Sequence, residues 1–196
     1  MRLALTTAAT AAVMFMNAPA LAHESVYAAP LLGSSEVPGV VTTGHGLGRV
    51  TIDFDLFTMR VEASFADLIG NVTAAHIHCC IAPGANVGVA SQTPSFTGFP
   101  LGVKSGSYAH TFDMTLASSY NAAFITGHGG TVDTAFAALV AGLDAGQAYL
   151  NLHSSFRGGG EIRGLLVPVP EPTTYVMMLG GLALLGWTAR RKARAN

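Results

Sequence analysis

The residues with the clearest capacity for chemistry are two histidines, His76 and His78. They flank Ile77 in a β-like run, so both imidazoles project to one face of the strand and Ile77 to the other. At a rise of about 3.4 Å per residue the two residues lie about 7 Å apart, and both rings can reach one ion at about 2.0 to 2.1 Å. The spacing therefore indicates a pair that can bind a metal.

A later run of the same kind supplies a third imidazole, because Tyr149, Asn151 and His153 share one face of a strand. If the two strands approach one another, His76, His78 and His153 converge into a set similar to open copper or zinc sites. An imidazole site holds copper(II) more tightly than zinc. The alternative is structural: the histidines hydrogen-bond loops and strand edges, and His153 fixes the turn that follows it.

Two adjacent cysteines, Cys79 and Cys80, come directly after the first histidine pair. They can form a vicinal disulfide, pair with another chain or bind a metal, and no third cysteine exists for a longer bridge within the chain. Reduced thiols and intermolecular disulfides both stay open. Cys79 and His128 are the candidates for a fourth metal ligand.

Two pairs of charged residues share a strand face, and the first of them could act as acid and base, but a structural interpretation is favoured for each. Asp53 and Asp55 share a strand face, where we expect them to be solvated and paired with nearby arginines. Glu161 and Arg163 also share a face, where we expect a cross-strand ion pair that fixes the last hairpin.

The elements that position these groups are indicated by a period-two alternation of apolar and polar residues, which is typical of half-buried strands. The apolar residues between Val132 and Leu143 instead share one helical face. The pattern predicts an all-β fold, an antiparallel β-sandwich of the immunoglobulin-like or superoxide-dismutase-like kind, with one short helix. The predicted strands, the first two forming a hairpin, are residues 50–57, 59–65, 108–115, 148–153 and 161–167.

Composition and charge separate a central domain from two unusual ends. Half of the 196 residues are apolar and only 11% are charged, against about 25% in ordinary soluble domains. The apolar excess lies at the ends, which leaves residues 23–167 as the domain. This domain has ten acidic and five basic residues, so its net charge is −5. We do not expect the domain to bind nucleic acid, because such binding needs a basic surface.

The first 22 residues have the pattern of a signal peptide. Arg2 precedes a mostly apolar run from Leu3 to Met16, and Ala20-Leu21-Ala22 supplies the small residues of a cleavage site. The apolar run is shorter than the roughly 20 residues of a spanning helix. We therefore expect an exported protein whose mature chain begins near His23.

The last 29 residues, 168–196, carry the most specific pattern. Pro170, Glu171 and Pro172 precede an almost uncharged segment, 173–189, which we expect to be a C-terminal transmembrane helix. The positive-inside rule keeps the basic cluster that ends the chain in the cytoplasm and places the domain across the membrane. That cluster consists of Arg190, Arg191, Lys192 and Arg194.

These three features together resemble the PEP-CTERM sorting signal of Gram-negative, biofilm-forming bacteria. The resemblance implies that an exosortase, a membrane-embedded transpeptidase-like enzyme, recognises and processes the tail. The alternative is a plain membrane anchor with an accidental triplet.

Five segments of the domain resemble, in order, the CHRD domain, which is named after chordin and also occurs in exported bacterial proteins. The residues after His78 depart from the Gly-containing turn that is common there. The family implies no settled activity. The segments are residues 31–38, 46–53, 75–78, 148–153 and 159–164.

Two functions follow as hypotheses. The first is a non-catalytic exported module, transiently anchored in the inner membrane and then displayed in the periplasm or envelope or released into a polysaccharide matrix, where it binds protein, polysaccharide or its own copies. The second is a copper- or zinc-binding protein or redox enzyme that uses His76, His78 and His153. A carboxylate behind each histidine would favour the enzyme, and no spacing in the sequence supplies one.

Overall fold

The computed structural model describes residues 23–170, 179–181 and 190. The leader, Glu171 and Pro172, most of the predicted transmembrane segment, and the basic cluster beyond Arg190 lie outside these residues. Within the part of the chain that is described, no helix has the length and apolar character needed to cross a membrane.

The described residues form a mainly antiparallel β structure with two α-helices and two 3₁₀ turns. Their order along the chain is β1 (Glu24–Leu32), a 3₁₀ turn (Gly33–Ser35), β2 (His45–Asp53), β3 (Thr58–Ala66), β4 (Val72–His78), β5 (Gly106–Asp113), a 3₁₀ turn (Ala117–Ser119), α1 (Ala122–Gly127), α2 (Val132–Asp144), β6 (Tyr149–Ser154), β7 (Ile162–Leu165) and β8 (Val167–Pro168).

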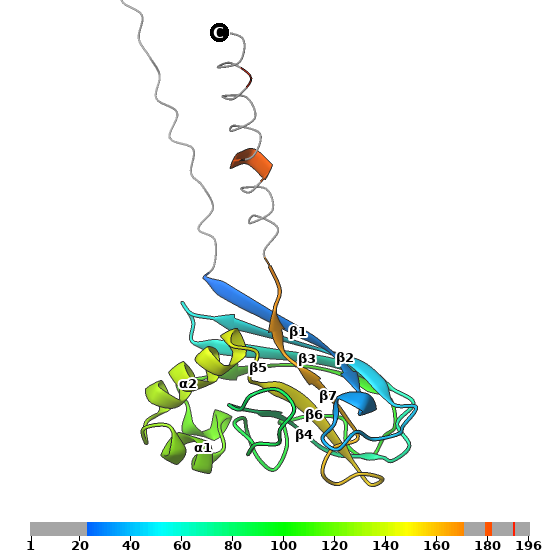
Figure 1. The fold of residues 1–196 in the computed structure, drawn as a ribbon. Coiled ribbons are helices and arrows are strands. Elements are labelled where there is room, and N and C mark those ends of the chain that lie inside the picture. Colours follow the sequence, from blue (N-terminus) through cyan, green and yellow to red (C-terminus); the bar gives the residue numbers. More distant parts are fainter. Residues whose placement is uncertain (1–22, 171–178, 182–189, 191–196) are drawn as a thin grey trace, which may run out of the picture.

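The strands belong to one sheet in the order β4-β6-β7-β1-β2-β3-β5, with β8 paired to β1 (Figure 1). The antiparallel β class and a sandwich-like fold are confirmed, and the structure adds that both layers belong to one sheet. One curled sheet brings its two halves face to face, so that a β-carbon at Gly48 of β2 would stand 2.6 Å from Cδ2 of Leu150 on β6. The halves join at β1 and β7, where Leu32 pairs with Arg163. Alternation of apolar and polar residues shows which face of a strand is buried, but it does not show which strands pair to join the two halves.

The predicted hairpin of residues 50–65 is present as β2 and β3, in a register that sets Val50 opposite Val61. Its turn occupies residues 54–57, which the alternation had assigned to the first strand, and Phe57 has a positive φ of 51°. Along both strands the alternate, apolar side chains are buried. The core therefore lies between the two halves of the sheet.

Helix α2 confirms the predicted helix: Thr131 caps it and Leu139 and Leu143 are fully buried. The prediction of a single helix is wrong, because α1 precedes it, capped by Asn121. Six residues are too short to show a helical period in the sequence. Strand β1 was also missed, since Ala28, Ala29 and Pro30 blur its alternation.

Candidate metal centre

The positions of the three histidines follow from the register between β4 and β6. His76 lies opposite Asn151, His78 lies opposite Tyr149, and His153 lies opposite Ala74. Residues that face each other in a sheet project to the same side. The three imidazoles therefore share one face of the strand pair, as the alternation predicts, while Ile77 points into the core and is fully buried.

On this face the three rings converge. One nitrogen from each of His76, His78 and His153 lies within 4.8 Å of the others. The ring centroids are 5.1 Å apart for His76 and His153, 5.8 Å for His78 and His153, and 6.0 Å for His76 and His78. The sequence predicted that His76, His78 and His153 converge if their two strands approach one another. The pairing of β4 and β6 meets this condition.

A backbone carbonyl orients each imidazole by accepting a hydrogen bond from one ring nitrogen. Nε2 of His76 lies 2.7 Å from the oxygen of Pro94, and Nδ1 of His78 lies 2.7 Å from that of Val87. Nδ1 of His153 lies 2.9 Å from the oxygen of Gly158. A carbonyl only accepts, so these nitrogens carry the proton and the second nitrogen of each neutral ring has a free lone pair.

The second nitrogen of each ring has no partner of this kind. Nδ1 of His76, Nε2 of His78 and Nε2 of His153 are buried and have no hydrogen-bond partner. Buried polar atoms are usually paired, so three unpaired acceptors in one cluster need an explanation. A metal ion supplies one, because neutral imidazoles bind a metal through this lone pair while the other nitrogen is held by a hydrogen bond.

Burial also keeps the three imidazoles neutral. Loss of solvation is the main cause that lowers the pKa of His76, His78 and His153, and it lowers that of His78 to about 4. The neighbouring imidazoles add to this effect at His76 and His78. At neutral pH the site is therefore ready to bind a metal, with no proton to displace.

The surroundings of the cluster come from segments far apart in the sequence. Pro94 and Val87 belong to the long connection between β4 and β5, which covers the histidine face. Tyr149 stacks on His78 with a centroid distance of 4.8 Å, and the guanidinium of Arg163 lies 4.6 Å from the centre of the Tyr149 ring. No carboxylate hydrogen-bonds the three histidines in the part of the chain that the structure describes.

Sequence reasoning missed Glu36, which lies beside this face. Its Oε2 is 3.8 Å from Nε of Arg163, and both side chains are almost fully buried. Burial raises the pKa of Glu36 to about 7, although the charge of Arg163 opposes the shift. No spacing could have found this pair, since the residues are separated by most of the domain.

The predicted ion pair between Glu161 and Arg163 is wrong. Arg163 pairs with Glu36, and Glu161 is a fully buried carboxylate that accepts four hydrogen bonds. Although burial raises its pKa, the bonds together outweigh that effect and hold the pKa below the ordinary value. The donors are the hydroxyls of Ser154 and Thr42 and the backbone N–H groups of Ile69 and Gly70. Glu161 therefore connects the loop before β2, the loop before β4 and the end of β6.

The aspartates near the first hairpin are also structural. Oδ1 of Asp53 accepts the backbone N–H groups of Asp55 and Leu56, which shapes the turn. The expected pairing with arginines is wrong, because Arg49 and Arg60 lie against Glu62 instead.

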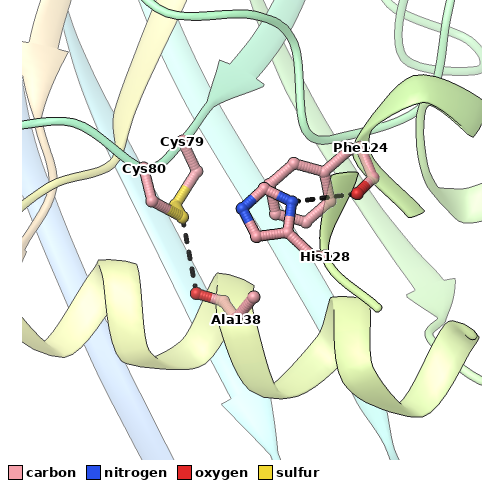
Figure 2. Close-up of a disulfide and its surroundings, with 5 residues drawn as sticks. All are labelled: Cys79, Cys80, Phe124, His128 and Ala138. Atoms are coloured by element: carbon pink, nitrogen blue, oxygen red, sulfur yellow. Dashed lines mark hydrogen bonds between the residues drawn. A yellow bond between two sulfur atoms is a disulfide. The ribbon is translucent and has the colours of Figure 1, made fainter. Parts of the chain in front are cut away.

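The two cysteines form a vicinal disulfide between Cys79 and Cys80 (Figure 2). It packs on α2, where Cys80 Sγ lies 3.4 Å from the oxygen of Ala138. A β-carbon at Gly142 would collide with both sulfurs, so glycine allows this close approach. Of the three outcomes left open by the sequence, the structure has the bridge within the chain.

Neither proposed fourth ligand joins the histidine cluster. Cys79 is in the disulfide, and its sulfur faces α2. His128 follows α1, where Nδ1 hydrogen-bonds the oxygen of Phe124 and the ring lies against the Phe124 ring, with centroids 4.1 Å apart (Figure 2). Among the described residues the candidate centre consists of His76, His78 and His153 alone.

Comparison with known proteins agrees with both resemblances seen in the sequence. The family model of the CHRD domain matches residues 27–166, and that of the PEP-CTERM protein-sorting motif matches residues 168–192. The motif marks the chain for export and for processing by an exosortase-type enzyme. No curated protein and no solved structure matches the chain.

Proposed function

Because the chain belongs to the CHRD-domain family and carries an exosortase sorting motif, we propose that its domain works outside the cytoplasm as a module that binds a transition-metal ion. The ligands are His76, His78 and His153. The observation that carries the proposal is a cluster of three imidazoles in which one nitrogen of each lies within 4.8 Å of the others and one nitrogen of each is buried without a hydrogen-bond partner.

A purely structural role explains only half of this arrangement. The hydrogen bonds to Pro94, Val87 and Gly158 would anchor the loops in either case. They do not account for three buried nitrogens without a partner in one cluster of imidazoles, because such acceptors are costly without a donor or a cation. A bound ion stabilises all three at once.

Copper(II) is the ion that this donor set favours, with zinc second. Imidazole suits both metals, and affinity follows the order in which copper(II) exceeds zinc. Three protein ligands also match the open sites in which a fourth position is left to water or another group.

We propose that the domain holds the ion without catalysing a reaction on it. His76 and His78 are 7% and 8% exposed and lie beneath the connection between β4 and β5, so a substrate can reach an ion here only from the side of the half-buried His153. Each imidazole is oriented by a carbonyl and not by a carboxylate that could move protons. A polysaccharide matrix or another envelope component remains a proposed partner of the exported module.

The test is metal analysis of the full chain after export, followed by competitive titration with copper(II) and zinc. We expect one ion at this site and affinities reduced about 100-fold or more in His76→Ala, His78→Ala and His153→Ala. His45→Ala is the matched control, because His45 is exposed and bonds only to the carbonyl of Thr43. Equal binding by all four variants, or no stoichiometric metal in the wild type, would mean that the cluster is structural.

Export is tested separately. A reporter enzyme joined after Val167 should be active if it functions only in the periplasm. Activity of a reporter that functions only in the cytoplasm would contradict the proposed location.

A further inference from the structure

A second set of metal-binding atoms lies at the start of the domain, away from the histidine cluster. His23 directly follows Ala20-Leu21-Ala22, the small residues of the proposed leader cleavage site. Its backbone nitrogen lies 3.1 Å from Oδ2 of Asp55, in the turn between β2 and β3. Its exposed ring packs against Phe54 at a centroid distance of 4.7 Å.

We infer that removal of the leader creates a copper(II) site at the new N-terminus, formed by the amine and imidazole of His23 and the carboxylate of Asp55. This inference rests on the proposed export. Water hydrolyses the peptide bond between Ala22 and His23, so that hydroxide adds to the Ala22 carbonyl and hydrogen to the His23 nitrogen. An amide nitrogen, which binds metals poorly, becomes an amine.

The chemistry of an N-terminal histidine suits copper(II). The amine and Nδ1 of one residue close a six-membered ring with the ion, so the two donors bind as a chelate. The amine of a chain terminus has a pKa of about 7.7 to 8.0, and one proton leaves it for each ion bound near neutral pH. Asp55 is already beside that nitrogen and supplies an oxygen donor with a negative charge.

The charge around this corner also favours a cation. Glu24 lies directly opposite Asp53 in the pairing of β1 and β2, and like charges in this position repel. Neither residue, nor Asp55, has a salt bridge among the described residues, where the arginines that pair do so with Glu62 and Glu36. A divalent ion would relieve this repulsion, and a free ammonium would do so only in part.

The experiment uses the full chain carrying His76→Ala and His78→Ala, exported with its own leader, so that the histidine cluster does not contribute. Mass spectrometry first identifies the N-terminal residue, and copper(II) is then titrated against a competing chelator. We expect one ion per chain and an electron paramagnetic resonance signal with nitrogen coupling. Affinity should fall about 100-fold in His23→Ala and about 10-fold in Asp55→Asn, and stay unchanged in His45→Ala.

A second comparison tests the role of the free amine. Ala22→Phe places a bulky residue in the cleavage site, so the leader should stay attached and the His23 nitrogen should remain an amide. This chain should lose the copper signal although His23 and Asp55 are intact. An unchanged signal would overturn the inference.

The outcomes separate this inference from the proposed function. If the mature chain begins at His23 but binds no copper, the amine forms only an ion pair with Asp55 and the inference is wrong, while export and the histidine cluster stand. If the chain begins elsewhere, the inference is overturned by the position of cleavage. The metal analysis of the histidine cluster is made independent of either result by repeating it in the His23→Ala chain, where the N-terminal site does not contribute.

Discussion

Tyr149 lies flat against His78, with the two rings within 2° of parallel and their centroids 4.8 Å apart. The register of β4 and β6 sets the two residues directly opposite each other. The Tyr149 hydroxyl also accepts the backbone N–H of Val87, whose oxygen holds Nδ1 of His78. One side chain thus fixes both the plane of a proposed metal ligand and the loop that orients it.

Tyr149→Ala should therefore weaken metal binding although it removes no ligand. We expect a loss of about 10-fold, as is usual for residues that orient metal ligands. Tyr149→Phe keeps the stacked ring and should stay within about 3-fold of the wild type. Competitive copper(II) titration of the two variants decides the point, and equal losses would show that the hydroxyl, and not the ring, matters.

The buried histidines should make the metal-free protein less stable in acid. Their pKa values are lowered in the folded state, that of His78 to about 4, from an ordinary value of 6.5. Between these values the unfolded chain binds more protons, so the free energy of unfolding falls as the pH falls from about 6.5 towards 4. Urea denaturation across this range should show the slope, and His78→Gln should reduce it.

Glu36 should change the free energy of unfolding with pH in the opposite direction to the histidines. Burial raises its pKa from 4.5 to about 7, against the charge of Arg163. The folded state then binds the extra proton, so this contribution to stability is complete below about pH 4.5 and is lost as the pH rises through 7. Glu36→Gln should make the slope between pH 4.5 and 7 steeper in the same urea series. An unchanged slope would show that Glu36 is ionised in the folded protein over this range.

Glu161→Ala should be among the most destabilising changes at a polar residue. The carboxylate is fully buried and accepts four hydrogen bonds, and its removal leaves their donors unpaired. We expect a loss of at least about 3 kcal/mol in the free energy of unfolding. Glu62→Ala is the control, because its ion pairs are exposed and should contribute less than about 1 kcal/mol. Similar losses in both variants would contradict the role given to Glu161.

Ile162→Asp should cost several kcal/mol, since Ile162 is fully buried and an unpaired charge would replace it. A domain has only about 5 to 15 kcal/mol in total, so we expect a largely unfolded protein by circular dichroism. Val167→Asp, at a position that is 47% exposed, should stay folded. A stable Ile162→Asp variant would show that β7 does not pack in the core.

Replacement of Pro170, Glu171 and Pro172 by alanine should block maturation in a host that has an exosortase. The sorting motif covers these residues, and without them the chain should remain intact and in the membrane fraction. Immunoblots of cell fractions check this outcome, with Thr173→Ala and Thr174→Ala together as the neighbouring control. Normal release of the triple-alanine variant would show that the triplet is only a linker.

The sequence by itself determined the features that depend on neighbouring residues. Alternation along residues 50–65 gave the hairpin, and the spacing of His76 and His78 placed both imidazoles on one face. The Pro170–Pro172 triplet with the segment that follows it identified the sorting tail, because such a motif is contiguous and needs no fold to be recognised.

Only the tertiary structure decided which distant residues meet. The register of β4 and β6 brought His153 to the first two histidines, and the junction of β1 and β7 placed Arg163 beside Glu36 instead of Glu161. The packing of α2 likewise removed Cys79 from the set of ligands. Periodicity shows which face of a strand is buried, but the partner of that face is chosen by the packing of the whole domain, and a local pattern carries no record of it.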